Sequence, residues 1–148
     1  SNSFMNRISW EDYALLLAKV AALRSKDPST KVGACVLRRD MTVASTGYNG
    51  PPPGIDISCW ENRDEKLRRV VHAEMNALKY LKPGEGFLLA TTSSPCSNCL
   101  PIICSYGIKK IVFETYYNRD NYVDQLCREF GIELEQRKIN SLLLQNLM

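Results

Sequence analysis

The sequence has few of the features that mark membrane-bound, fibrous or disordered proteins. No apolar run approaches the roughly 18 residues that a membrane-spanning helix needs, and the first residues lack the charged-then-apolar pattern of a secretory signal. Glycine and proline number only 8 and 7 in 148 residues, and no stretch is low in complexity. These absences exclude collagen-like and disordered chains. They favour a soluble cytoplasmic protein without a membrane partner.

The sequence also lacks a large excess of charge of one sign. The 19 basic and 16 acidic residues leave a net charge of +3, and the basic residues occur only in isolated pairs such as Lys109-Lys110. A nucleic-acid-binding protein usually carries a basic stripe or patch. We therefore expect no nucleic-acid partner, whereas a small anionic ligand is compatible with this balance.

The remaining composition is that of a single globular domain. A chain of this length buries a sizeable core without staples, and 45% of its residues are apolar. We assign residues 5–148 to one domain, and we expect Ser1–Phe4, which precede Met5, to be a remnant of expression.

Helical and strand patterns alternate along the chain after an initial hairpin. We expect helices over residues 13–23 (capped by Ser9), 72–80, from Pro95 to the Gly107 cap, 120–130 and 141–148. We expect strands over residues 31–37, 42–48, 86–92, 110–113 and 132–136, with a long Pro-rich connection from Asn49 to about Arg69. This order predicts an α/β fold, a three-layer α-β-α sandwich with a mixed five-stranded sheet.

Histidine is nearly absent, since His72 is the only one, while cysteine occurs six times. Without a secretory signal we expect these cysteines to be reduced. Cys35, Cys104 and Cys127 lie at apolar positions of predicted elements, where a thiol behaves as a small hydrophobic group. Cys96 and Cys99 call for another explanation.

Two short segments, His72-Ala73-Glu74 and Pro95-Cys96-Ser97-Asn98-Cys99, carry side chains suited to a metal site. Both are expected at helix starts, where the helix dipole favours thiolates. Cys96 and Cys99 are three residues apart and share a helix face, so with His72 they make three protein ligands. Three protein ligands leave a position for water, as catalytic zinc sites do. Two thiolates cancel the charge of the ion, so a carboxylate such as Glu74 would help to remove the proton of that water.

Each segment alone has an ordinary explanation. His72 suits a helix cap or the core, Glu74 suits a first helical turn, and a single C-x-x-C suits a redox pair or half of a structural zinc site completed by Cys59 or Cys104. Together the segments match the H-x-E…P-C-x-x-C signature of zinc-dependent nucleobase deaminases, which favours a catalytic zinc.

Several other residues are weaker candidates for ligand contacts. Asn49 ends a strand, where a turn explains it equally well, and Tyr117 follows a strand, where packing is the alternative. Arg24, Ser25 and Lys26 lie between a helix and a strand and could meet a phosphate, although a solvated loop explains them as well.

Between Arg24 and Tyr117 the chain resembles the deoxycytidylate (dCMP) deaminases of the zinc-dependent cytidine deaminase superfamily. The zinc motifs specify the superfamily, and the Gly47-Tyr48-Asn49-Gly50 loop and Asn76-Ala77 narrow the match. The other similar segments are Arg24-Ser25-Lys26-Asp27-Pro28, Val32-Gly33-Ala34-Cys35-Val36 and Ile108-Lys109-Lys110-Ile111-Val112-Phe113.

The resemblance implies hydrolysis of dCMP to dUMP and ammonia. One zinc ion would be held by His72, Cys96 and Cys99, and Glu74 would shuttle protons during attack at C4 of cytosine. Asn49 would contact the deoxyribose and Tyr117 would lie beside the nucleotide. Arg24, Ser25 and Lys26 are the phosphate candidates.

The resemblance also implies a regulated hexamer that supplies dUMP for thymidylate synthesis. Members are commonly activated by dCTP and inhibited by dTTP near the loop that here contains Asn49 and Gly50, and Mg²⁺ would accompany a triphosphate effector. This chain departs from the family at Pro51-Pro52-Pro53, and it has no further histidine for a second, structural zinc. The alternatives left open are dCTP, deoxycytidine or cytidine as substrate, base editing of a nucleic acid, and a non-enzymatic zinc module.

Overall fold

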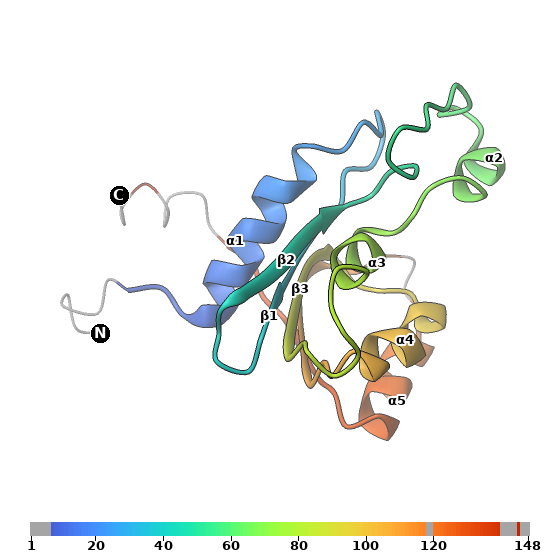
Figure 1. Cartoon of the computed structure of the whole chain (residues 1–148). Helices are drawn as coiled ribbons and strands as arrows, with labels where there is room; N and C mark the ends of the chain where they lie inside the picture. Colours follow the sequence, from blue (N-terminus) through green and yellow to red (C-terminus); the bar gives the residue numbers. More distant parts are fainter. Residues whose placement is uncertain (1–6, 118–119, 140–144, 146–148) are drawn as a thin grey trace.

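The computed structural model describes residues 7–117, 120–139 and 145, and its centre is a five-stranded sheet with helices on both faces (Figure 1). The strand order is β2-β1-β3-β4-β5; β1 is antiparallel to both of its neighbours, and β3, β4 and β5 are parallel. The strands are β1 (Gly33–Leu37), β2 (Val43–Tyr48), β3 (Leu88–Ser93), β4 (Lys110–Thr115) and β5 (Glu133–Gln136). The predicted α/β sandwich with a mixed sheet is therefore confirmed.

The helices divide between the two faces of the sheet. Helix α1 (Trp10–Ala22) covers one face, and α3 (Ala73–Leu78), α4 (Leu100–Ser105) and α5 (Tyr122–Glu129) cover the other (Figure 1). Successive residues of a strand point to opposite faces, so Cys35 packs with the α1 side of the core and Val36 with the other side. All of β1 is buried for this reason, which accounts for its uninterrupted apolar sequence.

Most predicted elements are present, with shifted ends. Ser9 caps α1 as expected, since its Oγ accepts a hydrogen bond from Asp12 N at 3.1 Å. The last predicted helix, residues 141–148, lies outside the described residues except for Gln145. Within the described part of the chain, no helix is long and apolar enough to cross a membrane.

Two expectations about local structure were wrong. Pro95 does not begin a helix, because Cys96 is still extended; a short 3₁₀ turn, η1 (Ser97–Cys99), precedes α4. The long connection after β2 contains a helix, α2 (Arg63–Leu67). Its first turn is fixed by Asn62, whose Oδ1 accepts a hydrogen bond from Glu65 N at 3.1 Å.

Gly47 allows β2 to lie directly against α3. A Cβ atom at this position would lie 2.5 Å from Ala77 N and 2.6 Å from Ala73 O, both in the backbone of α3. We expect Gly47→Ala to lower the free energy of unfolding by about 2 kcal/mol, because overpacking must move the helix or the strand. For a chain of this size, that is a fall in Tm of about 4–8 °C in a thermal melt.

Gly50, three residues after Gly47, offers a matched control for this substitution. No atom lies within 4 Å of the place that a Cβ atom would take at Gly50, and the backbone there is not left-handed. Gly50→Ala should therefore melt within about 1 °C of the unaltered protein, on the same scale. Equal melting temperatures for the two variants would contradict the packing assigned to Gly47.

Candidate functional site

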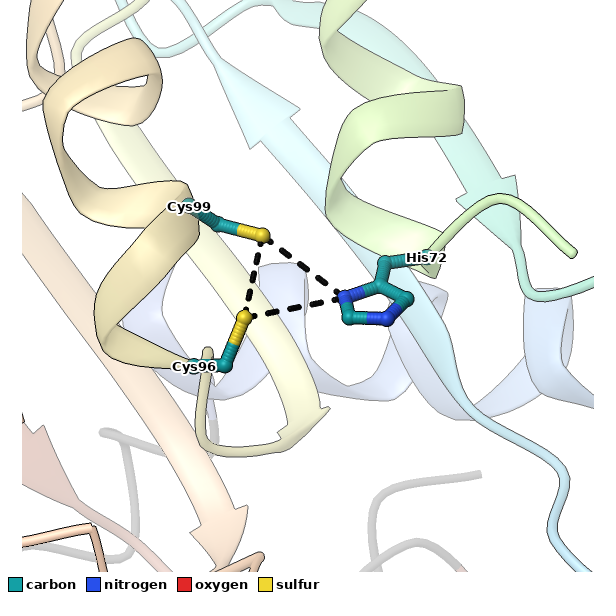
Figure 2. A group of neighbouring side chains, drawn as sticks. All are labelled: His72, Cys96 and Cys99. Carbon is teal, nitrogen blue, oxygen red and sulfur yellow. Dashed lines mark hydrogen bonds between the residues drawn. The ribbon is translucent and has the colours of Figure 1, made fainter. Parts of the chain in front are cut away.

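His72, Cys96 and Cys99 meet in space and direct their side chains toward a common point (Figure 2). His72 Nδ1 lies 3.9 Å from Cys96 Sγ and 3.6 Å from Cys99 Sγ, and the two sulfur atoms are 3.2 Å apart. A disulfide bond is about 2.05 Å long, so this is a pair of free thiols. Among the described residues, this is the group of three whose ligand atoms could hold one metal ion.

The separations fit a tetrahedral zinc ion. Zinc bonds of about 2.3 Å to sulfur and about 2.1 Å to nitrogen place two sulfur ligands about 3.8 Å apart and a sulfur and a nitrogen ligand about 3.6 Å apart. The observed distances lie within about 0.6 Å of these values. Neither Cys59 nor Cys104 belongs to the group, so among the described residues the set has three protein ligands, as in a catalytic site.

All three side chains stand at the beginning of a helical segment. His72 is the N-cap of α3, Cys96 of η1 and Cys99 of α4, and none of them forms a side-chain capping hydrogen bond. A capping role therefore does not account for these residues. Their side chains contact one another instead, and they do so at helix starts, where negative charge is favoured.

The close contacts shift the acidity of the three groups. The hydrogen bond to Cys96, followed by that to Glu74, raises the pKa of His72 to about 10. Hydrogen bonds with Cys99 and then His72 lower the pKa of Cys96 to about 4, and the neighbouring Cys96 raises the pKa of Cys99. One thiolate is thus favoured even before a metal binds, and a metal ion would displace the remaining protons.

Glu74 lies beside this group but is not one of its ligands. It is only 4% exposed, and its Oε1 lies 3.5 Å from His72 Nδ1. Glu74 also lines a cavity that is lined by His72 and Cys96 as well. A buried carboxylate that lines the cavity beside a group able to hold a metal ion is placed to exchange protons with a molecule bound there.

The cavity has a volume of about 370 Å³, within the range of small-molecule sites. It lies at the edge of the sheet where β2 and β3 end and β1 begins. Asn49 and Tyr117, both expected to contact a ligand, line it together with His72, Cys96 and Glu74. The structure thus brings these residues to one cavity, although 68 positions separate Asn49 from Tyr117.

The Gly47-Tyr48-Asn49-Gly50 loop frames the start of α3. Gly50 and Val71, which precedes His72, exchange two backbone hydrogen bonds, and Asn76 Nδ2 donates to Tyr48 O at 2.7 Å. The Asn49 side chain accepts from Val32 N and donates to Thr30 O, each at 2.9 Å. The loop therefore couples the histidine helix to the chain that enters β1.

Tyr117 is held by contacts from two directions. Its backbone N donates to Ser94 Oγ at 3.0 Å, and its hydroxyl accepts a hydrogen bond from Arg63 Nη2 at 2.9 Å. Arg63 belongs to α2, so this helix reaches across to the loop after β4. Trp60, Arg63 and Lys66 all line the cavity, and none was foreseen from the sequence. The Asn62–Glu65 capping pattern is the one signal that marked this helix.

The phosphate candidates Arg24, Ser25 and Lys26 are not among the residues that line the cavity. Ser25 is buried and donates to Asn49 O at 2.9 Å, so it supports the loop that carries Asn49. Lys26 is exposed and lies 3.5 Å from Asp56. Gly50 lines a second, smaller hollow of about 170 Å³, together with Pro51 and Lys79.

Comparisons with known proteins agree with this geometry. Residues 8–115 match the family described as "Cytidine and deoxycytidylate deaminase zinc-binding region". The chain is 32% identical to ComE operon protein 2 of Bacillus subtilis, over 95% of this chain and 77% of that protein. It is 35% identical to the deoxycytidylate deaminase of Homo sapiens, over 76% of this chain and 70% of the human one.

A solved structure shares both sequence and fold with the chain. The crystal structure of the dCMP deaminase from the cyanophage S-TIM5, in complex with dCMP and dUMP, superposes with a TM-score of 0.73. The match covers 85% of this chain and 95% of the phage protein, at 30% identity.

Proposed function

This chain belongs to the cytidine and deoxycytidylate deaminase family and is a deaminase, and we propose that it hydrolyses dCMP to dUMP and ammonia. The observation that carries this proposal is that Glu74 lines one cavity together with His72 and Cys96, two members of the group that could hold a metal ion. The substrate is supported by the human relative, which is a deoxycytidylate deaminase, and by the phage enzyme, which was crystallised with dCMP and dUMP.

In the proposed mechanism the metal would activate water, and Glu74 would transfer protons. His72, Cys96 and Cys99 would hold a zinc ion, which would supply an acidified water for attack at C4 of the cytosine ring. Glu74 accepts a proton from this water and passes it to N3 of the ring. It would then take the proton of the new hydroxyl group at C4 and deliver it to the departing amino group, so that ammonia leaves and a carbonyl remains at C4. Burial of Glu74 keeps bulk water away from these transfers.

Asn49 and Tyr117 are proposed to hold the nucleotide. An Asn side chain has two N–H donors, and one of those of Asn49 is used by Thr30 O. Within the described part of the chain the second donor has no partner, so it could bind a deoxyribose hydroxyl. Tyr117 lines the same cavity, and its hydroxyl accepts a hydrogen bond from Arg63. Arg24, Ser25 and Lys26 stay our phosphate candidates, and the Asn49 loop that Ser25 supports links this segment to the cavity.

Regulation and assembly are carried over from the family as proposals. We propose a hexamer in the cytoplasm that supplies dUMP for thymidylate synthesis, with dCTP as activator and dTTP as inhibitor. Asn49 and Gly50 would respond to the effector, because one lines the substrate cavity and the other lines the hollow beside it. Mg²⁺ would enter only with a triphosphate effector. The six free cysteines suit a reducing compartment.

Ammonia release from a panel of substrates tests the proposal. Zinc-loaded protein is given dCMP, CMP, deoxycytidine and dCTP, each with and without added dCTP or dTTP. We expect dCMP to have the highest kcat/KM and dTTP to suppress its turnover. Preference for dCTP or deoxycytidine would overturn the phosphate assignment but keep the chemistry. Release from none of them would contradict the proposed activity.

A further inference from the structure

Helix α2 forms one wall of the cavity without being part of the hydrophobic core. In Figure 1 it stands away from the sheet and from the helices that pack on it. Of its five residues only one, Lys66, is buried, while its apolar residue Leu67 is 44% exposed. The helix that carries Arg63 to the cavity is therefore not held in place by apolar packing of its own side chains.

Lys66 instead forms the most buried ion pair among the described residues. Its Nζ lies 2.9 Å from Asp27 Oδ2, and the two side chains are 10% and 2% exposed. The other carboxylate oxygen of Asp27 accepts hydrogen bonds from Ser29 N, Ser29 Oγ and Thr30 N, at 2.9 to 3.1 Å. One carboxylate oxygen of Asp27 is thus bound within its own loop, and the other is paired with Lys66.

This ion pair joins two walls of the same cavity. Residues 27–30, from the loop before β1, line one side, and α2 lines another. The loop is connected further to the Asn49 side chain, which accepts from Val32 N and donates to Thr30 O. At its other end α2 reaches Tyr117 through Arg63. The Lys66–Asp27 pair is therefore the buried link between α2 and the part of the site that holds Asn49.

We propose that Lys66 is a positioning residue for substrate binding: its buried ion pair with Asp27 holds α2 as a wall of the nucleotide cavity. This inference rests on the proposed function, because it concerns the affinity for the nucleotide substrate. Among the described residues, α2 forms no hydrogen bond or ion pair with the metal group or Glu74. Loss of the wall should therefore weaken binding of substrate and transition state alike, which raises KM and spares kcat.

The test is the kinetics of Lys66→Met with dCMP. We expect KM to rise about tenfold and kcat to stay within about twofold, with zinc content unchanged and with dUMP binding weakened by a similar factor. Lys66→Arg keeps the cation and should restore KM to within about threefold of the unaltered protein. Lys19→Met is the matched control, because it removes a lysine from another ion pair, with Glu114, whose residues do not line the cavity.

Two results would overturn the inference. One is an unaltered KM in Lys66→Met; the other is a loss of kcat and zinc without a change in KM, which would make the pair merely structural. If Lys66→Met does not fold, Asp27→Asn takes its place, since an amide oxygen still accepts the bonds from Ser29 and Thr30. Failure of both variants to fold would also overturn it. If the unaltered protein does not turn over dCMP, the proposed function has failed instead.

Discussion

Glu74→Gln will lower kcat for dCMP by about a thousand-fold or more and leave the zinc content unchanged, because general acid–base catalysis contributes about 10²–10⁴-fold and Glu74 is proposed to serve two proton transfers. The amide has nearly the same shape as the carboxylate but cannot accept the proton of the attacking water. Glu74 is not one of the three metal ligands, so the metal site should persist. The loss would therefore come from proton transfer alone.

The comparison needs two measurements on each purified variant: initial rates of ammonia release and zinc per chain. Glu129→Gln is the matched control, because Glu129 is an exposed residue of α5 that contacts Gln125. It should keep full activity. Turnover of Glu74→Gln within tenfold of the unaltered protein would contradict the role of Glu74. Loss of zinc from this variant would show instead that Glu74 helps to hold the metal.

Cys99→Ser will lose most of its zinc and at least a thousand-fold of its activity. A serine hydroxyl is a far weaker zinc ligand than a thiolate, because it does not ionise at neutral pH. Only two protein ligands of the described group would remain. The expected activity loss follows from the contribution of the metal-activated water, without which no nucleophile of comparable strength is available near neutral pH.

Dialysis against a chelator, followed by metal analysis and a rate assay, checks this prediction. Cys104→Ser is the control: Cys104 Sγ donates a weak hydrogen bond to Phe130 O, which a hydroxyl can replace, and the residue lies outside the metal group. It should keep one zinc per chain and its activity. A Cys99→Ser protein that retained stoichiometric zinc would contradict the ligand assignment.

The parts of the site set by local geometry were predictable from the sequence. His72, Cys96 and Cys99 each lie at the start of a helical segment, and the three-residue spacing brings the two cysteines together. His72 joins them from 24 positions away and was predicted from the motif signature rather than from spacing. The mixed sheet followed from the alternation of helical and strand patterns. The helix starts, the cysteine spacing and the strand patterns depend on neighbours along the chain, which a sequence displays directly.

Other parts depend on contacts between distant residues. The Lys66–Asp27 pair spans 39 positions and the Arg63–Tyr117 bond spans 54, and neither leaves a periodic pattern. Helix α2 buries a lysine and no apolar residue, so hydrophobic periodicity could not reveal it. The helix expected at Pro95 was wrong for a local reason, since Cys96 remains extended and η1 intervenes before α4.

The Gly47-Tyr48-Asn49-Gly50 segment shows the difference most clearly. Its resemblance to a family could be seen in the sequence, but the contacts that it makes in the structure could not. Gly47 permits the close approach to α3, and Gly50 pairs with the residue before His72. Asn49 is tied to the chain entering β1. These roles required the partners to be placed in space.

The most direct measurement is to incubate zinc-loaded protein with dCMP in water enriched in the heavy oxygen isotope and to weigh the product by mass spectrometry. Hydrolytic deamination predicts dUMP that carries one heavy oxygen, at C4, with one ammonia released for each molecule formed. The Glu74→Gln protein, run in parallel, should form almost none. Unchanged dCMP, or dUMP without the heavy oxygen, would contradict the account.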